Sequence, residues 1–127
     1  MSDTYTGISF SLKRRRVMIH RSTLRALGMP KNIRFLLNMK KKRIAVQVCE
    51  AIDRDSFKAP DHFKSYECYE ISSLNFLSVV YKMAGWDSDR NYRIKGRLFA
   101  ENRLVEFELS EAVVIADEEF VDPDVIV

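Results

Sequence analysis

Two stretches of alternating apolar residues, separated by a short run of cations, constrain the fold of this 127-residue chain most strongly. Every second residue is apolar in residues 33–39 ("IRFLLNM"), and the alternation resumes in residues 44–48 ("IAVQV"). A period of two places such side chains on one face of a β-strand. The four residues between the stretches are Lys40, Lys41, Lys42 and Arg43. Two strands around a four-residue polar tip predict a β-hairpin.

A strand and a short helix are predicted just before this hairpin. Val17 and Ile19 alternate with polar neighbours in "RRVMIH", which is typical of a short strand. In "RSTLRALG", Ser22 or Thr23 is a candidate N-cap, and Gly28 suits the position just after a helix. Pro30 then prevents the helix from continuing. The predicted order is strand, helix, hairpin.

The same order of elements is predicted a second time in residues 66–115. "YECYEI" is a candidate strand, and "SSLNFLSVVYKMAGW" has apolar residues every three or four positions, as in an amphipathic helix. "NYRIKGRLF" and "RLVEFELSEA" then predict a second hairpin around "AEN". Adding 61 to the residue number places Ile44 on Val105 and Val46 on Phe107. The pattern is compatible with two generic hairpins, but the shared element order favours an internal duplication.

The chain is therefore expected to be one compact domain, spanning residues 1–127, built of two repeats. The expected parts are a basic unit at 14–51, a connecting loop at 52–65, a second unit at 66–115 and an acidic tail at 116–127. The predicted fold class is mostly β with two helices (α+β).

Charge is distributed very unevenly along the chain. Residues 1–46 hold 12 of the 21 Lys and Arg residues but only one of the 18 Asp and Glu residues, which leaves this segment at +11. The remaining 9 bases and 17 acids give residues 47–127 a charge of −8. The formal total of +3 therefore conceals a segment that attracts polyanions.

Other features limit the class of protein. No apolar run reaches the roughly 18 residues of a membrane span, and the first residues lack the apolar core of a signal peptide. The expectation is an intracellular, cytoplasmic protein with no membrane partner. Cys49 and Cys68 lie in no metal-binding motif, so two thiols are expected rather than a disulfide or a metal site.

The first unit resembles the AbrB-like group of small DNA-binding modules, which includes MraZ, SpoVT and MazE-type relatives. The resemblance lies in "VMIHRSTLRALGMPKNIRFLLN", mainly in Val17, Ile19, Leu27, Gly28, Ile33 and Phe35. The chain departs from the family at three points. His20 stands where the family has Pro, Arg25 comes one residue later than the family Arg, and no Gly marks the hairpin tip. The acid-and-Arg signature of MraZ helices is also absent.

The resemblance implies that two strand-helix-hairpin units form one interlocked β-barrel, here within a single chain. It also implies that the loop before the helix and nearby strand ends supply cations to DNA. The expected DNA-binding residues share a location in the +11 segment, and they are Lys13, Arg14, Arg15, Arg16, Arg21, Arg25, Lys40, Lys41, Lys42 and Arg43. DNA would neutralise these repelling charges and release counterions. For the hairpin tip taken alone, a solvated turn is the simpler interpretation.

No motif in the sequence indicates an enzyme. GxSxG, GxxxxGK[ST], HExxH and GxGxxG are all absent, and no cofactor or metal is expected. Trp86 and Tyr92 lie among cations and are candidates for stacking on unpaired bases, but packing at the end of the barrel is preferred. His20 is a candidate for either a phosphate contact or local packing.

The leading hypothesis is a non-enzymatic DNA-binding transcription regulator or antitoxin-like protein. Its acidic second unit and tail would face a second copy (a homo-oligomer such as a dimer), a toxin-like protein partner, or the chain's own basic face. The rival hypothesis is an interaction or scaffold module of a phage or mobile element that binds no nucleic acid and pairs its cations with acids.

Overall fold

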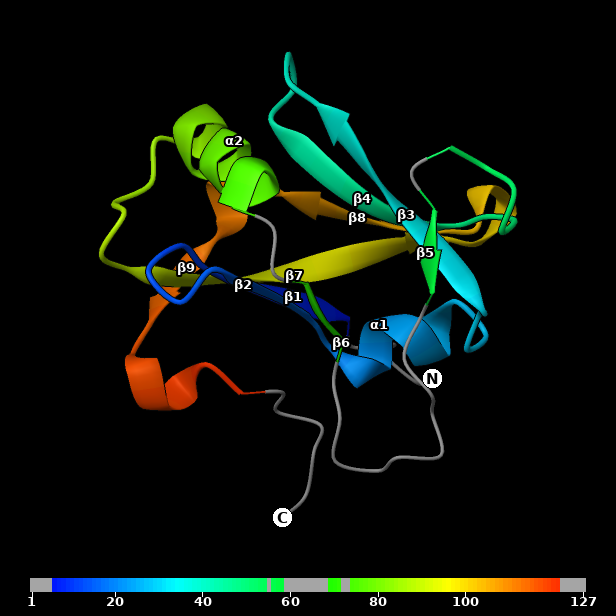
Figure 1. Ribbon diagram of the computed structural model, residues 1–127, viewed down its shortest axis with the longest axis horizontal. Coiled ribbons are helices and arrows are strands. Elements are labelled where there is room, and N and C mark those ends of the chain that lie inside the picture. The colour runs from blue at the N-terminus through cyan, green and yellow to red at the C-terminus, as the bar shows by residue number, and fades with distance from the viewer. Residues whose placement is uncertain (1–5, 55, 59–68, 72–73, 122–127) are drawn as a thin grey trace.

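The computed structural model describes residues 6–54, 56–58, 69–71 and 74–121. In this part of the chain, nine strands form one antiparallel sheet that curls into a half-barrel, and two α-helices lie on either side of β1 and β7 (Figure 1). The prediction of a mostly β fold with two helices is confirmed. No helix among these residues is long and apolar enough to cross a bilayer.

The elements follow one another in a simple order. The strands are β1 (Gly7–Ser11), β2 (Arg16–Ile19), β3 (Asn32–Asn38), β4 (Arg43–Val48), β5 (Phe57–Lys58), β6 (Tyr69–Ile71), β7 (Asn91–Phe99), β8 (Leu104–Glu108) and β9 (Val113–Ile115). The helices are α1 (Arg21–Ala26) and α2 (Leu74–Ala84), with single 3-10 turns η1 (Ala100–Asn102), η2 (Leu109–Glu111) and η3 (Asp117–Glu119). In the predicted connecting loop at 52–65, residues 52–54 form turns and residues 57–58 form β5. Residues 55 and 59–65 of this loop lie outside the described residues.

Strand pairing joins the two predicted units through their second hairpin strands. The order across the sheet is β5-β3-β4-β8-β7-β1-β2-β6, and β9 pairs with the first residues of β7. β4 pairs antiparallel with β8, where Ala45 lies opposite Glu106. β2 pairs antiparallel with β6, where Val17 lies opposite Ile71. The first strand of each unit therefore contacts that of the other, as the second hairpin strands also do.

Three hairpins end in loops of the same length, each with a left-handed fourth residue. In each loop, four residues separate the last paired residues, and the fourth has a left-handed backbone. The left-handed residues are Arg15 (φ 56°), Lys42 (φ 56°) and Arg103 (φ 54°). The sequence offset of 61 places Lys42 on Arg103, so the two predicted hairpins match in their loops as well as in their apolar residues.

The first hairpin loop differs from the prediction by one residue. The loop contains Met39 to Lys42, and Arg43 is already paired with Asn38 as the first residue of β4. The Asn38 side-chain oxygen accepts a hydrogen bond from the Lys41 backbone N–H (3.0 Å), which holds the turn in this register. Met39, expected to continue the strand, is therefore 64% exposed.

Helix α1 is held on β1 by two hydrogen bonds between the Thr23 side chain and the Gly7 backbone. The Gly7 N–H donates to Thr23 Oγ1 (2.9 Å), and the Thr23 hydroxyl donates to the Gly7 carbonyl (2.7 Å). The predicted N-cap role of Ser22 or Thr23 is wrong, because His20 occupies that position and the Thr23 hydroxyl is bonded to Gly7. Gly28 has φ +80° and follows the helix as predicted.

The core fills the concave side of the sheet and is closed by α2. Leu77 and Val80 of α2 are fully buried, and Tyr81 is 3% exposed. The Tyr81 hydroxyl donates to the Arg90 carbonyl (2.7 Å) and accepts from the Leu12 N–H (3.1 Å), so its burial leaves no polar atom unsatisfied. Burial raises the Tyr81 pKa to about 12.

Candidate nucleic-acid interface

Nine of the ten cations expected to bind DNA lie in three places in the fold, and the tenth, Arg43, is the first residue of β4. Residues 13–16 form the exposed end of the β1–β2 hairpin, residues 40–42 lie in the β3–β4 loop, and the helix α1 carries the remaining pair, Arg21 and Arg25. The helix begins at the opposite end of β2 from the β1–β2 loop, roughly 15 Å away along the strand at about 3.3 Å per residue. The cations are therefore not brought together in one cluster.

The β3–β4 loop is the place where positive charge is least compensated. Lys40, Lys41 and Lys42 are all exposed, and no described acidic side chain forms an ion pair with them. The loop projects away from the sheet at the top of the view in Figure 1. A projecting loop with three adjacent, unpaired ammonium groups can approach a phosphate backbone without displacing any group of its own.

The β1–β2 loop is exposed, but its first two cations, Lys13 and Arg14, already contact other side chains. Lys13 Nζ lies 2.6 Å from Asp117 Oδ1, and the Arg14 guanidinium lies over the Phe120 ring, 5.8 Å from its centre. The hydrogen bonds from Lys13 and Asn91 hold the pKa of Asp117 below its usual value. Arg15 follows in the left-handed conformation and is exposed.

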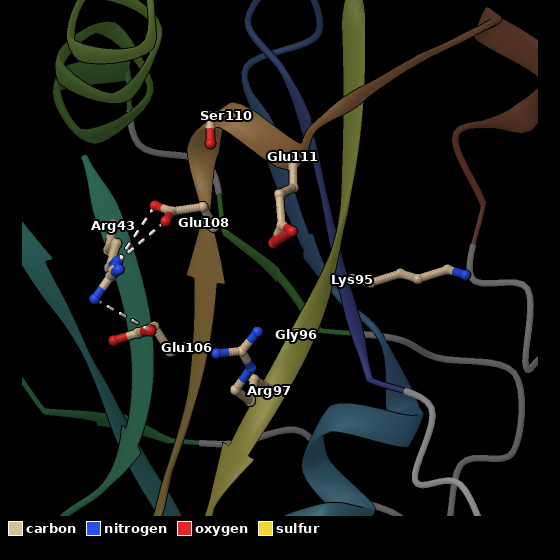
Figure 2. A pocket seen from close by; sticks show the side chains of 8 residues that line it. All are labelled: Arg43, Lys95, Gly96, Arg97, Glu106, Glu108, Ser110 and Glu111. Atoms are coloured by element: carbon tan, nitrogen blue, oxygen red, sulfur yellow. Dashed lines mark hydrogen bonds and ion pairs between the residues drawn. The ribbon is translucent and has the colours of Figure 1, made fainter. Parts of the chain in front are cut away.

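Arg43 is separated from the lysines that precede it in sequence. Its Nε donates to both carboxylate oxygens of Glu108 at 3.3 Å, and its guanidinium lies 3.8 Å from Glu106 (Figure 2). Both acids lie on β8, next to β4 in the sheet. The charge of Arg43 is therefore balanced by two acids of the neighbouring strand, unlike the charges of the three lysines.

Arg43 also borders a polar hollow of about 400 Å³ on the outer face of the sheet. Its lining residues are Arg43, Lys95, Gly96, Arg97, Glu106, Glu108, Ser110 and Glu111. Cations and acids are equal in number there, and Lys95 extends away from the hollow in Figure 2. The lining therefore does not concentrate one sign of charge on a ligand.

His20 lies inside the protein, which favours local packing over the phosphate contact. The side chain is fully buried, and Nε2 lies 2.8 Å from Ser9 Oγ. Arg93 Nε donates to the same hydroxyl (3.3 Å) from β7. The histidine is part of a packed polar network beneath α1 and is not placed to contact a phosphate. Trp86 and Tyr92 likewise stack on each other (4.3 Å) and pack against the core, as preferred from the sequence.

The C-terminal segment supplies site residues that the sequence did not reveal. The sequence predicted an acidic tail at 116–127, and within it Phe120 is only 3% exposed and packs with Met18 and Ile115. Arg93 donates to the backbone carbonyls of Glu119 and Val121. The two buried apolar residues of this segment, Ile115 and Phe120, were the only available signal. Residues 122–127 of the predicted tail lie outside the described residues.

Comparison of the chain with family models, curated proteins and solved structures found no match. Within the part of the chain that the structure describes, no group of three or more His, Cys, Asp or Glu side chains is arranged to hold a metal ion. The case for a function therefore depends on the geometry and charge described above.

Proposed function

We propose that the protein is a non-enzymatic DNA-binding regulator or antitoxin-like protein that contacts duplex DNA through its two basic hairpin loops. The observation that carries the proposal is the β3–β4 loop, where three exposed lysines have no described acidic partner. The matching β7–β8 loop has the same length and the same left-handed fourth residue without a lysine run. The turn itself therefore does not require three lysines, and an external polyanion accounts for them.

A left-handed residue is common to all three hairpin loops. Glycine or asparagine is favoured at such positions, because a Cβ there is strained. All three hairpin loops instead have a cation at this position: Arg15, Lys42 and Arg103. Because Arg103 lies in the β7–β8 loop, which is not proposed to bind DNA, the left-handed residue belongs to the turn and does not distinguish the DNA-binding loops.

The fold proposed for this function is a duplicated AbrB-like barrel in which the two units interlock. The common loop geometry at an offset of 61 and the pairing of β4 with β8 and of β2 with β6 support it. If the units interlock, a protein cut at a protease site introduced in 59–65 should remain one particle in gel filtration. Separation of the two fragments under native conditions would contradict interlocking.

The test of DNA binding is fluorescence anisotropy with a labelled 20-base-pair duplex at several salt concentrations. Replacing Lys40, Lys41 and Lys42 with Gln should reduce the slope of log K against log salt by about 2–3, at about 0.9 for each phosphate contact. The control is the triple Gln variant of Lys31, Lys58 and Lys82, which are exposed lysines outside the two loops. Equal effects of the two variants would show that only net charge matters, and no binding at low salt would refute the proposal.

A second candidate function, an interaction module without nucleic-acid binding, is favoured by two observations. Lys13 pairs with Asp117 and Arg43 pairs with Glu106 and Glu108, as expected if the cations serve to compensate acids of the same chain. Its acidic second unit would then meet a basic protein. Absence of DNA binding in the anisotropy experiment would favour this candidate.

A further inference from the structure

We propose that residues 113–121, here named the C-terminal strap, compete internally with DNA for the β1–β2 loop. This inference rests on the proposed DNA-binding function and adds its regulation. In Figure 1 the strap, drawn in orange and red, runs from β9 past the β1–β2 loop. The strap would lower the affinity of the loop for DNA until DNA displaces it.

The strap is fixed to the protein at its start and near its end. β9 pairs with β7, with Ile115 opposite Asn91 and Val113 opposite Arg93. Farther along, Phe120 is buried against Met18. These contacts place the middle of the strap, η3, next to the loop whatever the state of the loop's own side chains.

Two side chains of the strap contact the first two cations of the β1–β2 loop, Lys13 and Arg14. Asp117 accepts from Lys13 at 2.6 Å and from Asn91 Nδ2 at 2.9 Å. Phe120 places its ring under the guanidinium of Arg14. A carboxylate on Lys13 and a π-face on Arg14 are groups that a phosphate would have to replace.

The two basic loops differ in this respect, which argues for competition rather than general charge balance. The loop at residues 40–42 has no described acidic partner, whereas the loop at residues 12–15 carries an acid bound at its first cation. The strap therefore covers one predicted DNA contact and leaves the other open. DNA bound first by the open loop would be positioned to displace the strap from the covered one.

The contact between Asp117 and Lys13 is of a kind that DNA can displace. The two side chains are 52% and 37% exposed, so water and salt screen their attraction. Exposed ion pairs are weak, and removing this one should strengthen DNA binding by about two- to fivefold at low salt. The advantage should disappear at high salt, where the pair is already screened.

The test compares Asp117→Asn with Glu118→Gln by anisotropy on the same 20-base-pair duplex at low and high salt. Both changes remove one negative charge from η3, but the Glu118 side chain forms no ion pair or hydrogen bond with the described residues. The expected result is about two- to fivefold tighter binding for Asp117→Asn and less than twofold for Glu118→Gln. A thermal melt of each variant checks that the fold is retained.

Hydrogen exchange on the unmodified protein provides a second measurement that needs no variant. Saturating duplex should accelerate exchange of the backbone amides in 117–121 and slow it in 12–16. Equal tightening by both variants, or exchange in 117–121 that DNA leaves unchanged, would overturn the strap while leaving DNA binding intact. Failure of the unmodified protein and both variants to bind would refute DNA binding itself, and the strap with it.

Discussion

Replacing Lys42 with glycine should make the protein more stable while weakening its binding to DNA. Lys42 has φ 56°, and a left-handed backbone costs a residue with a Cβ roughly 1–2 kcal/mol. Glycine removes that strain but adds about 0.4–1 kcal/mol of conformational entropy to the unfolded chain. The difference is a net gain in the free energy of unfolding of roughly 0.5–1 kcal/mol.

Urea unfolding followed by tryptophan fluorescence measures this gain. Trp86 is the only tryptophan, and it stacks on Tyr92 at 4.3 Å against the core, so its emission should report global unfolding. The loop is exposed to solvent in both the folded and the unfolded protein. The urea midpoint should therefore rise, while the dependence of the unfolding free energy on urea concentration (the m-value) stays the same. Anisotropy with the duplex should show a salt slope lower by about 0.9 for the one lost cation.

Lys40→Gly is the matched control for this prediction. It removes the same charge from the same loop, but Lys40 is not among the residues with positive φ. It should weaken DNA binding similarly and lower the free energy of unfolding by roughly 0.5–1 kcal/mol, because glycine gains entropy without relieving strain. If Lys42→Gly destabilises the protein as much as Lys40→Gly does, the argument from backbone strain is wrong.

Three further predictions concern groups away from the loops. Tyr81→Phe should abolish a loss of stability that the unmodified protein shows between pH 10 and 12. In the folded protein the Tyr81 phenol, with its pKa raised to about 12, stays protonated while the same group ionises in the unfolded chain, which lowers the free energy of unfolding by up to about 3 kcal/mol. Urea titrations of both proteins at pH 9 and 11.5 measure this loss. Gly7→Ala should lower the free energy of unfolding by roughly 1–3 kcal/mol, because its Cβ would overlap the buried His20 ring, and an unchanged urea midpoint would contradict this. Arg43→Gln should leave the salt slope of DNA binding unchanged, since Glu108 already holds that guanidinium; a decrease near 0.9 would instead place Arg43 on a phosphate.

Local patterns were enough to predict most of the elements. Alternation predicted β3, β4, β7 and β8, and in β7 and β8 the buried residues do recur at alternate positions. In β4 three consecutive residues are buried, and the end of β3 is exposed. Gly28 and Gly85 have positive φ and follow the two helices, as glycines in that position commonly do. The element order of the second unit also follows the prediction, although residues 66–68 lie outside the described residues.

The remaining features depend on contacts between distant residues. β1 was not predicted, because "GISFS" has few strand-favouring residues, and its position is set by pairing with β7 more than 80 residues later. The docking of Phe120 depends on Met18, about 100 residues earlier, so the acidic composition of the segment could not reveal it. Arg43 was grouped with the lysines because its partner Glu108 is 65 residues away.

The pairing of β1 with β7 has a consequence for how the protein is made. Gly7 lies opposite Lys95, so one edge of β1 has no partner until 88 further residues have been synthesised, which takes roughly 4–18 s at the usual 5–20 residues per second. During this interval the buried side chains of β1 and the open edge of β4 are exposed to other nascent chains. The +11 charge of residues 1–46 repels identical chains at this stage. The same cations that are proposed to bind DNA in the finished protein would thus limit aggregation of the unfinished one.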